Sequence, residues 1–181
     1  MTLPQKMRLD AAHNRALIVE AARATFADGG VQAPMRAVAA RAGLGVATVY
    51  RHFPTHAALL DAVLAQRVAE CAAELDAALG DPDPWRPLAG TVRRFAARQL
   101  ADRALNEALF AAGAQFAEAR RAHAAALAGL VERARAAGAV RGDLTVDDVR
   151  AGLLAISALR GRPTAVDRLT DLLLAGMRAQ P

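Results

Sequence analysis

The N-terminal third of the chain holds three runs in which apolar residues recur every three or four positions, as they do on one face of an α-helix. The first run predicts a helix over residues 14–28, which Gly29 and Gly30 end. In the next two runs the apolar positions fall at i, i+3, i+4 and i+7. They are Met35, Val38, Ala39 and Ala42, then Val46, Val49, Tyr50 and Phe53. Both helices are too short to fold alone, so we expect each to bury its apolar face against the rest of the domain.

A tight turn separates these two short helices. Gly43 and Gly45 are expected to supply the backbone freedom that ends one helix and starts the next at a steep angle. This arrangement is a helix-turn-helix. If the second helix docks its apolar face inward, its opposite face presents small, hydroxyl and cationic groups, which suit the major groove of DNA. These residues are Ala47, Thr48, Arg51 and, at the edge, His52.

The rest of the chain reads as helices with short breaks. A long helix is expected over residues 56–79, and the proline-rich segment 80–84 ends it. Further helices are expected over residues 87–100, 105–112, 118–137, 146–159 and 165–179. Thr145 is placed to cap the helix that starts at residue 146, with Asp147 and Asp148 in its first turn.

About nine helices predict an all-α protein. We expect an N-terminal three-helix domain with the helix-turn-helix over residues 1–55, and a C-terminal helical bundle over residues 56–181. Composition agrees, because the hydrophobic fraction of 54% is dominated by Ala and Leu and aromatic residues make up only 4%.

The formal net charge of +5 is concentrated near the helix-turn-helix. Residues 1–55 contain seven basic and three acidic residues (7 − 3 = +4), whereas the remainder contains 16 basic and 15 acidic residues (+1). A basic surface is needed there to attract DNA phosphates. A solvated basic face of an Arg-rich protein is the alternative interpretation.

The helix-turn-helix residues resemble those of the TetR family of transcriptional regulators. The family pattern Ala-x-x-Ala-Gly-aliphatic appears here as residues 39–44, and Thr-aliphatic-Tyr-x-His-Phe as residues 48–53. The resemblance covers roughly residues 13–64. Two positions depart from it: Gly45 stands where Ser is common, and Ala33-Pro34 replaces a Ser or Thr cap. Pro34, expected at the first helical position, would partly compensate by presetting φ.

Side-chain chemistry and this resemblance together suggest a set of DNA contacts. The set is Arg36, Ala47, Thr48, Tyr50, Arg51, His52, Thr55 and His56. Arg36 can grip a phosphate or a guanine edge, and the resemblance implies that its position touches DNA. Thr55 and His56 begin the long helix, whose positive dipole end can face a phosphate. Two alternatives stay open: Tyr50 partly in the core, and Thr55 as an N-cap only.

The resemblance also implies roles for the C-terminal bundle, namely ligand binding and dimerisation. The last two helices would form a homodimer interface, and the dimer would bind a double-stranded operator that is an inverted repeat. These helices carry apolar faces through Val149, Leu153, Ile156, Val166, Leu169, Leu173 and Met177, and packing only inside one subunit is the alternative.

Candidates for binding a small-molecule effector are aromatic residues and polar residues that interrupt apolar stripes. They are Trp85, Phe95, Gln99, Phe110, Phe116 and His123. Gln99 and His123 could equally be ordinary satisfied polar residues. Because aromatic residues are few and no charged cluster is obvious, a modest apolar effector is expected.

Catalytic and metal-binding patterns are weak. The chain has one serine, Ser157, and one lysine, Lys6, and Pro54 should interrupt any helix that would align His52 with His56 on a metal. We therefore expect no enzyme activity, metal or cofactor. A buried packing role is expected for Cys71, with redox sensing as the alternative.

No run of 18 uncharged apolar residues and no signal-peptide pattern is present, so no membrane association and a cytoplasmic location are expected. Two other functions stay open: an architectural protein that binds DNA without regard to sequence, and an all-α enzyme.

Overall fold

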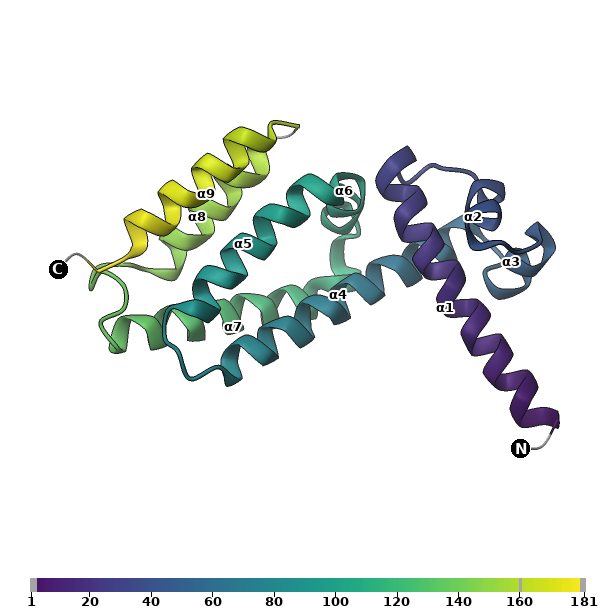
Figure 1. Cartoon of the computed structure of the whole chain (residues 1–181), viewed down its shortest axis with the longest axis horizontal. Coiled ribbons are helices and arrows are strands. Elements are labelled where there is room, and N and C mark those ends of the chain that lie inside the picture. The colour runs from purple at the N-terminus through teal and green to yellow at the C-terminus, as the bar shows by residue number, and fades with distance from the viewer. Residues whose placement is uncertain (1–2, 160, 180–181) are drawn as a thin grey trace. The chain divides into compact units, whose positions relative to one another are not determined.

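The computed structural model describes residues 3–159 and 161–179, with the side chains of residues 3–9 and 110 outside the description. This part of the chain folds into nine α-helices and one short 3₁₀-helix (Figure 1). They are α1 (Leu3–Gly29), α2 (Met35–Ala42), α3 (Val46–His52), α4 (His56–Gly80), α5 (Arg86–Ala101), α6 (Arg103–Ala111), η1 (Gly113–Phe116), α7 (Ala117–Ala136), α8 (Val146–Ala158) and α9 (Pro163–Met177). The described residues include no β-strand, and the all-α prediction is confirmed.

Most helices lie where the periodicity placed them, but α1 is much longer than predicted. It begins at Leu3 instead of residue 14. Its first half lacks an apolar stripe, so the pattern of apolar positions did not indicate a helix there. Pro4 fits because the first turn of a helix does not need its missing N–H.

The chain forms two compact units. The first consists of the residues up to Arg67 together with Ala104–Ala111, and the second of Val68–Arg103 and the residues from Ala112 onward. In the first unit α1 packs against α2, and α2 against α3. Its core holds Ile18, Ala22, Phe26, Val38, Val49, Leu59 and Val63, all at most 1% exposed. These side chains fix the short helices that could not be stable by themselves.

In the second unit α5 packs against α7, α8 and α9. The core takes leucine, valine and alanine side chains from all four helices, and Ile156 and Met177 join it from α8 and α9. The last residue of α9 lies beside the segment after α7, where the N–H of Arg141 donates to the carbonyl of Met177 at 3.0 Å. Next to this contact the Arg178 guanidinium lies 4.5 Å from the centre of the Trp85 ring.

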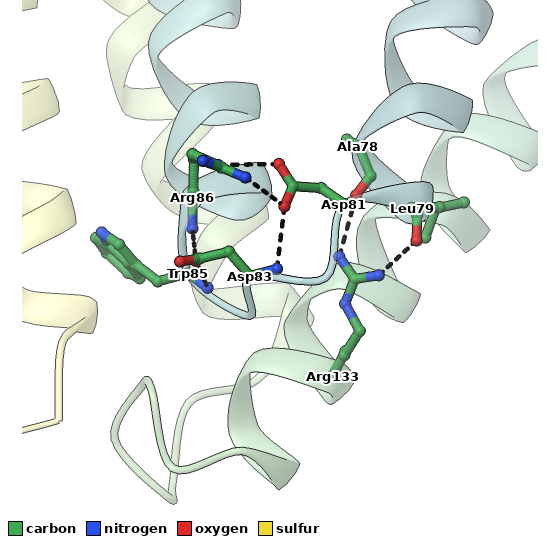
Figure 2. A network of polar contacts seen from close by, with 7 residues as sticks. All are labelled: Ala78, Leu79, Asp81, Asp83, Trp85, Arg86 and Arg133. Carbon is green, nitrogen blue, oxygen red and sulfur yellow. Dashed lines mark hydrogen bonds and ion pairs between the residues drawn. The ribbon is translucent and has the colours of Figure 1, made fainter.

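The break between α4 and α5 is an ordered capping network (Figure 2). One carboxylate oxygen of Asp83 accepts hydrogen bonds from the N–H groups of Trp85 (2.8 Å) and Arg86 (2.6 Å) at the start of α5. Asp81 forms a two-pronged ion pair with Arg86 at 2.8 and 2.9 Å. Arg133 of α7 donates to the carbonyls of Ala78 and Leu79, which lie in the last turn of α4.

These contacts shift the acidity of both aspartates. Hydrogen bonds donated by the Arg86 side chain lower the pKa of the Asp81 carboxyl. Hydrogen bonds donated by the backbone N–H groups of Arg86 and Trp85 lower the pKa of the Asp83 carboxyl. Each donor favours the ionised carboxylate. The proline-rich segment therefore ends α4 and also holds the first residues of α5 in place.

Thr145 caps α8 as predicted. Its hydroxyl oxygen accepts the N–H of Asp148 at 3.2 Å, and the Asp148 carboxylate accepts the N–H of Thr145 at 2.9 Å. The hydroxyl and the N–H of Thr145 lower the pKa of Asp148. This reciprocal pair is a complete capping box.

Candidate nucleic-acid interface

The turn between α2 and α3 depends on one of its two glycines. Gly43 has φ 67° and ψ 26°, in the left-handed region that glycine adopts at little cost. The N–H of Leu44 then reaches back to the carbonyl of Ala39 at 3.0 Å, which closes the end of α2. Gly45 has φ −65° and ψ 142°, which any residue adopts, so the predicted conformational role applies to Gly43 alone.

Both short helices start without a side-chain cap. Gly45 is the N-cap residue of α3, where it offers no side-chain acceptor. Pro34 is the N-cap residue of α2, with φ −72° and ψ 149°. The prediction that Pro34 is the first helical residue was therefore wrong by one position, since its extended ψ precedes the helix.

The helix α3 has a buried face and an exposed face. Val49 is fully buried, while Ala47, Tyr50 and Arg51 are exposed. Tyr50 is 47% exposed, so about half of its surface is available to a ligand, and a partial role in packing stays open. Thr48 and His52 are half-buried at the edges of the exposed face. Val46, assigned to the inner face by the apolar pattern, is 42% exposed at the first turn of the helix.

Two arginines of the first unit form ion pairs with acidic residues, and two others on α2 and α3 form none in the part of the chain that the structure describes. Arg41 forms an ion pair with Asp28 at 2.6 Å, and Arg23 pairs with Glu20 at 2.6 Å. No ion pair to Arg36 or Arg51 is formed among the described residues. Both are exposed, on the first turn of α2 and the last turn of α3. These two arginines can therefore reach a DNA ligand without breaking a contact seen here.

Thr55 and His56 have different roles at the start of α4. The Thr55 hydroxyl oxygen accepts the N–H of Ala58 at 3.1 Å, so Thr55 is an N-cap, and its hydroxyl hydrogen is still able to bind a phosphate. The His56 ring lies 5.4 Å from the Phe26 ring, and its buried Nε2 has no hydrogen-bond partner in the described structure. Because His56 packs toward α1, we leave it out of the interface proposed below.

The effector candidates do not form one cluster. Phe95 and Gln99 lie one turn apart on α5 and are half-buried, and Phe116 is buried at the end of η1. His123 of α7 is half-buried, with Nδ1 2.8 Å from the carbonyl of Ala119. Trp85 lies 14 residues before Gln99, about 21 Å along the helix axis. Phe110 belongs to α6, and its side chain lies outside the described residues.

A charged cluster in the second unit was missed by the sequence reasoning. Glu74 of α4 forms ion pairs with Arg94 (3.1 Å) and Arg98 of α5. All three side chains are partly buried, with 24–41% of each exposed. The spacing of Arg94 and Arg98 by four residues was the available signal, since it places both on one face of α5. The sequence analysis found no obvious charged cluster, and the structure shows this one in the second unit.

The described residues include neither a metal-binding cluster nor a membrane-spanning helix. No group of three or more His, Cys, Asp or Glu side chains is placed to hold a metal ion. No helix there is both long and apolar enough to cross a bilayer.

Two family models match the chain. Residues 18–63 match the model of bacterial regulatory proteins of the tetR family. Residues 83–179, more than half of the chain, match the C-terminal domain of SbtR-like transcriptional regulators. No curated protein sequence matches the chain.

Solved structures of bacterial regulators resemble the whole chain. A TetR transcription regulatory protein from Mycobacterium vanbaalenii is 35% identical, with 95% of this chain and 99% of that one covered and a TM-score of 0.74. A TetR transcriptional regulator from Streptomyces coelicolor is 32% identical, with 92% and 99% covered and a TM-score of 0.73. The similarity extends over both units.

Proposed function

Because the chain belongs to the TetR family of bacterial transcriptional regulators, we propose that it is a repressor released from DNA by a small molecule. In this proposal a homodimer binds an inverted-repeat operator in the cytoplasm. The observation that carries it is the exposed surface of α2 and α3, which offers Arg36, Tyr50 and Arg51 while the opposite faces of both helices are buried.

Direct reading of bases by α3 is sparse. Arg51 reaches a guanine edge or a phosphate, Thr48 offers a hydroxyl and a methyl group, and Ala47 packs against a thymine methyl at most. Tyr50, His52 and the hydroxyl of Thr55 contact phosphates, which position the helix without reading sequence. Arg36 adds a further base or phosphate contact from the start of α2.

Exposed leucines on α8 and α9 support a dimer through these two helices. Leu154 is 64% exposed and Leu172 is 53% exposed, although both are large and apolar. The sequence analysis assigned the apolar faces of these helices to the dimer interface. Three of their residues, Val149, Ile156 and Met177, instead lie in the core of the subunit, and each is at most 1% exposed. The proposed interface therefore uses the outward leucines of α8 and α9 instead.

A two-fold dimer would place two copies of α3 about 34–36 Å apart, or a multiple of that distance, on successive turns of DNA. The effector would bind in the second unit beside Phe95, Gln99, Phe116 and His123; Phe110 belongs to the first unit and is left out of this proposal. We do not assign Trp85 to this site, because Arg178 covers its ring. Ligand binding would displace α4 and change the separation of the two copies of α3.

The test starts from genomic DNA fragments selected by the purified protein. We expect enrichment of inverted repeats, and Arg36→Ala and Tyr50→Phe should each weaken binding to the enriched site while folding is unchanged. The loss should be about 1–3 kcal/mol if Arg36 reads a base. Arg121→Ala, which removes an exposed arginine from α7, is the matched control.

Two outcomes would contradict the proposal. Equal affinity for the enriched site and for random DNA would favour an architectural protein that binds regardless of sequence. Wild-type affinity in both variants at matched salt would place the DNA interface elsewhere on the chain.

A further inference from the structure

The first turn of α3 exposes a large apolar side chain. Val46 is the first residue of this helix, and 42% of its surface is exposed. The apolar pattern assigned it to the inner face with Val49, which is fully buried. Three other residues of α3 are exposed as well, namely Ala47, Tyr50 and Arg51. Val46 therefore belongs to the outer surface of the helix.

The four exposed residues of α3 form one continuous strip. An α-helix has 3.6 residues per turn, so positions 46, 47, 50 and 51 fall within an arc of about 140° around its axis. Val46 thus lies on the same side of α3 as Arg51, which is the side that the proposed function assigns to DNA. A residue at this place on the helix meets whatever the strip binds.

The start of α3 carries no polar side chain. Gly45 has none at all, Ala47 offers one methyl group, and Val46 lies between them with its isopropyl group. Apart from its chain neighbours, a β-carbon built at Gly45 would meet only the Thr48 Oγ1, at 3.9 Å. The space at this end of the helix is therefore open, and a flat surface such as the edges of bases can approach Val46 closely.

Apolar groups can read only one feature of the major groove. In a helix-turn-helix the N-terminal residues of the second helix contact the base edges. These edges present hydrogen-bond donors and acceptors, to which thymine adds its C5 methyl group. Valine suits such a contact, because its branched side chain has one strongly preferred rotamer in a helix and loses little freedom on binding.

We propose that Val46 selects one thymine in each half-site of the operator by packing its isopropyl group against the C5 methyl group. The inference rests on the proposed DNA-binding function, and it adds to the interface a residue that the sequence analysis did not place there. Burial of one methyl group corresponds to about 4-fold in affinity. Two half-sites bound by a homodimer correspond to about 15-fold.

The first experiment changes the DNA and leaves the protein intact. In the operator enriched by the wild type, deoxyuridine replaces thymine at one position at a time, in both half-sites. Deoxyuridine pairs as thymine does and lacks only the methyl group. At one position the wild-type affinity should fall about 15-fold at constant salt. Because the protein is unchanged, this loss cannot come from misfolding.

The second experiment asks whether Val46 makes the contact. Val46→Ala should bind the unmodified operator more weakly and should lose little more on the deoxyuridine operator, because both changes remove the same contact. Its affinity for random DNA should stay near the wild-type value, since that binding depends on phosphates. Leu100→Ala removes a leucine of α5 that is 37% exposed, and this control should keep the full sensitivity to deoxyuridine. Circular dichroism checks that both variants fold.

A change of base preference supplies an independent readout. Glutamine can form two hydrogen bonds with the edge of adenine. A new selection of DNA with Val46→Gln should therefore move the preferred base at the sensitive position from thymine to adenine. A side chain that only stabilises the helix would alter affinity without altering the preferred base.

Three results would overturn the inference. The first is an operator in which no deoxyuridine lowers the wild-type affinity. The second is an equal loss in the wild type and in Val46→Ala, which would assign the methyl contact to Ala47 or Thr48. The third is an unchanged preference for thymine in Val46→Gln. Failure of the proposed function looks different, because the wild type would then not discriminate the operator from random DNA.

Discussion

Gly152 of α8 lies directly against Leu173 of α9. A β-carbon at residue 152 would be 2.6 Å from both δ-methyl groups of Leu173, closer than carbon atoms approach. The absence of a side chain at Gly152 lets the two helices pack at this distance. Leu173 is half-buried, so its own movement is restricted by neighbouring core residues.

Gly152→Ala should therefore lower the free energy of unfolding by about 1–3 kcal/mol, because the added methyl group overpacks the contact. Denaturant titration measures this change. Gly176→Ala on α9 is the control, since nothing lies within 4 Å of its β-carbon and alanine favours helix. Full additivity of Gly152→Ala and Leu173→Ala would contradict the clash, which predicts that the second change relieves the first.

The turn before α3 allows a paired test of its two glycines. Gly43→Ala should destabilise the first unit by about 1–2 kcal/mol, because a β-carbon is disfavoured at φ 67° even though space is free around it. Gly45→Ser should be neutral or stabilise by a few tenths of a kcal/mol, since it adds a side-chain cap at an ordinary φ. The melting temperatures of the two variants, measured by circular dichroism, compare the two effects. Equal destabilisation by both changes would be inconsistent with the geometry of the turn.

The proposed dimer predicts different outcomes for neighbouring positions on α8 and α9. Leu172→Asp and Leu154→Asp should yield folded monomers, because the leucines are exposed in the subunit and would be buried only in the dimer. Ile156→Asp should unfold the subunit, because Ile156 is fully buried within it. Analytical ultracentrifugation and circular dichroism separate the two effects. Folded dimers in both leucine variants would move the interface elsewhere.

Stability should depend on pH in the acid range through the capping aspartates. The pKa of Asp83 is lowered by the N–H groups that it caps, from an ordinary value of 3.8, so its contribution is complete above that value and is lost as the pH falls through the folded-state pKa. The free energy of unfolding should therefore be flat near neutral pH and decline below about pH 4.

Asp83→Asn separates charge from hydrogen bonding, because the asparagine side-chain oxygen can still accept from the N–H groups of Trp85 and Arg86 but does not titrate in this range. The variant should show a weaker acid dependence than the wild type. An unchanged profile would mean that the hydrogen bonds of Asp83 contribute no pH dependence. Asp76→Asn, which removes an exposed carboxylate from α4, serves as the control.

The proposed effector site predicts a loss of induction without a loss of DNA binding. Gln99→Trp and His123→Trp should fill space in the second unit and block release from the operator, while operator affinity stays near the wild-type value. A coupling of about 1–3 kcal/mol corresponds to a 5- to 150-fold change in affinity, which titration of DNA binding with an identified effector resolves. Full induction in both variants would place the site elsewhere.

The sequence by itself determined the helices, the helix-turn-helix and the cap at Thr145. These features depend on neighbours within a few residues: the helical period, a glycine such as Gly43 after the last apolar position, and a hydroxyl before the first turn. The motif at residues 39–53 identified the family for the same reason, because its residues are contiguous.

Tertiary structure decided which partner each face meets. Periodicity marked Ile156 as apolar, but only packing against α5 and α9 placed it in the subunit core and left Leu154 exposed. The contacts of His56 with Phe26 and of Trp85 with Arg178 join residues 30 or more positions apart. The ion pairs of Glu74 join it to residues 20 and 24 positions further along the chain. The helical period specifies the direction of a side chain around its own axis. The partner is set by how separate helices pack, and that is a property of the folded chain.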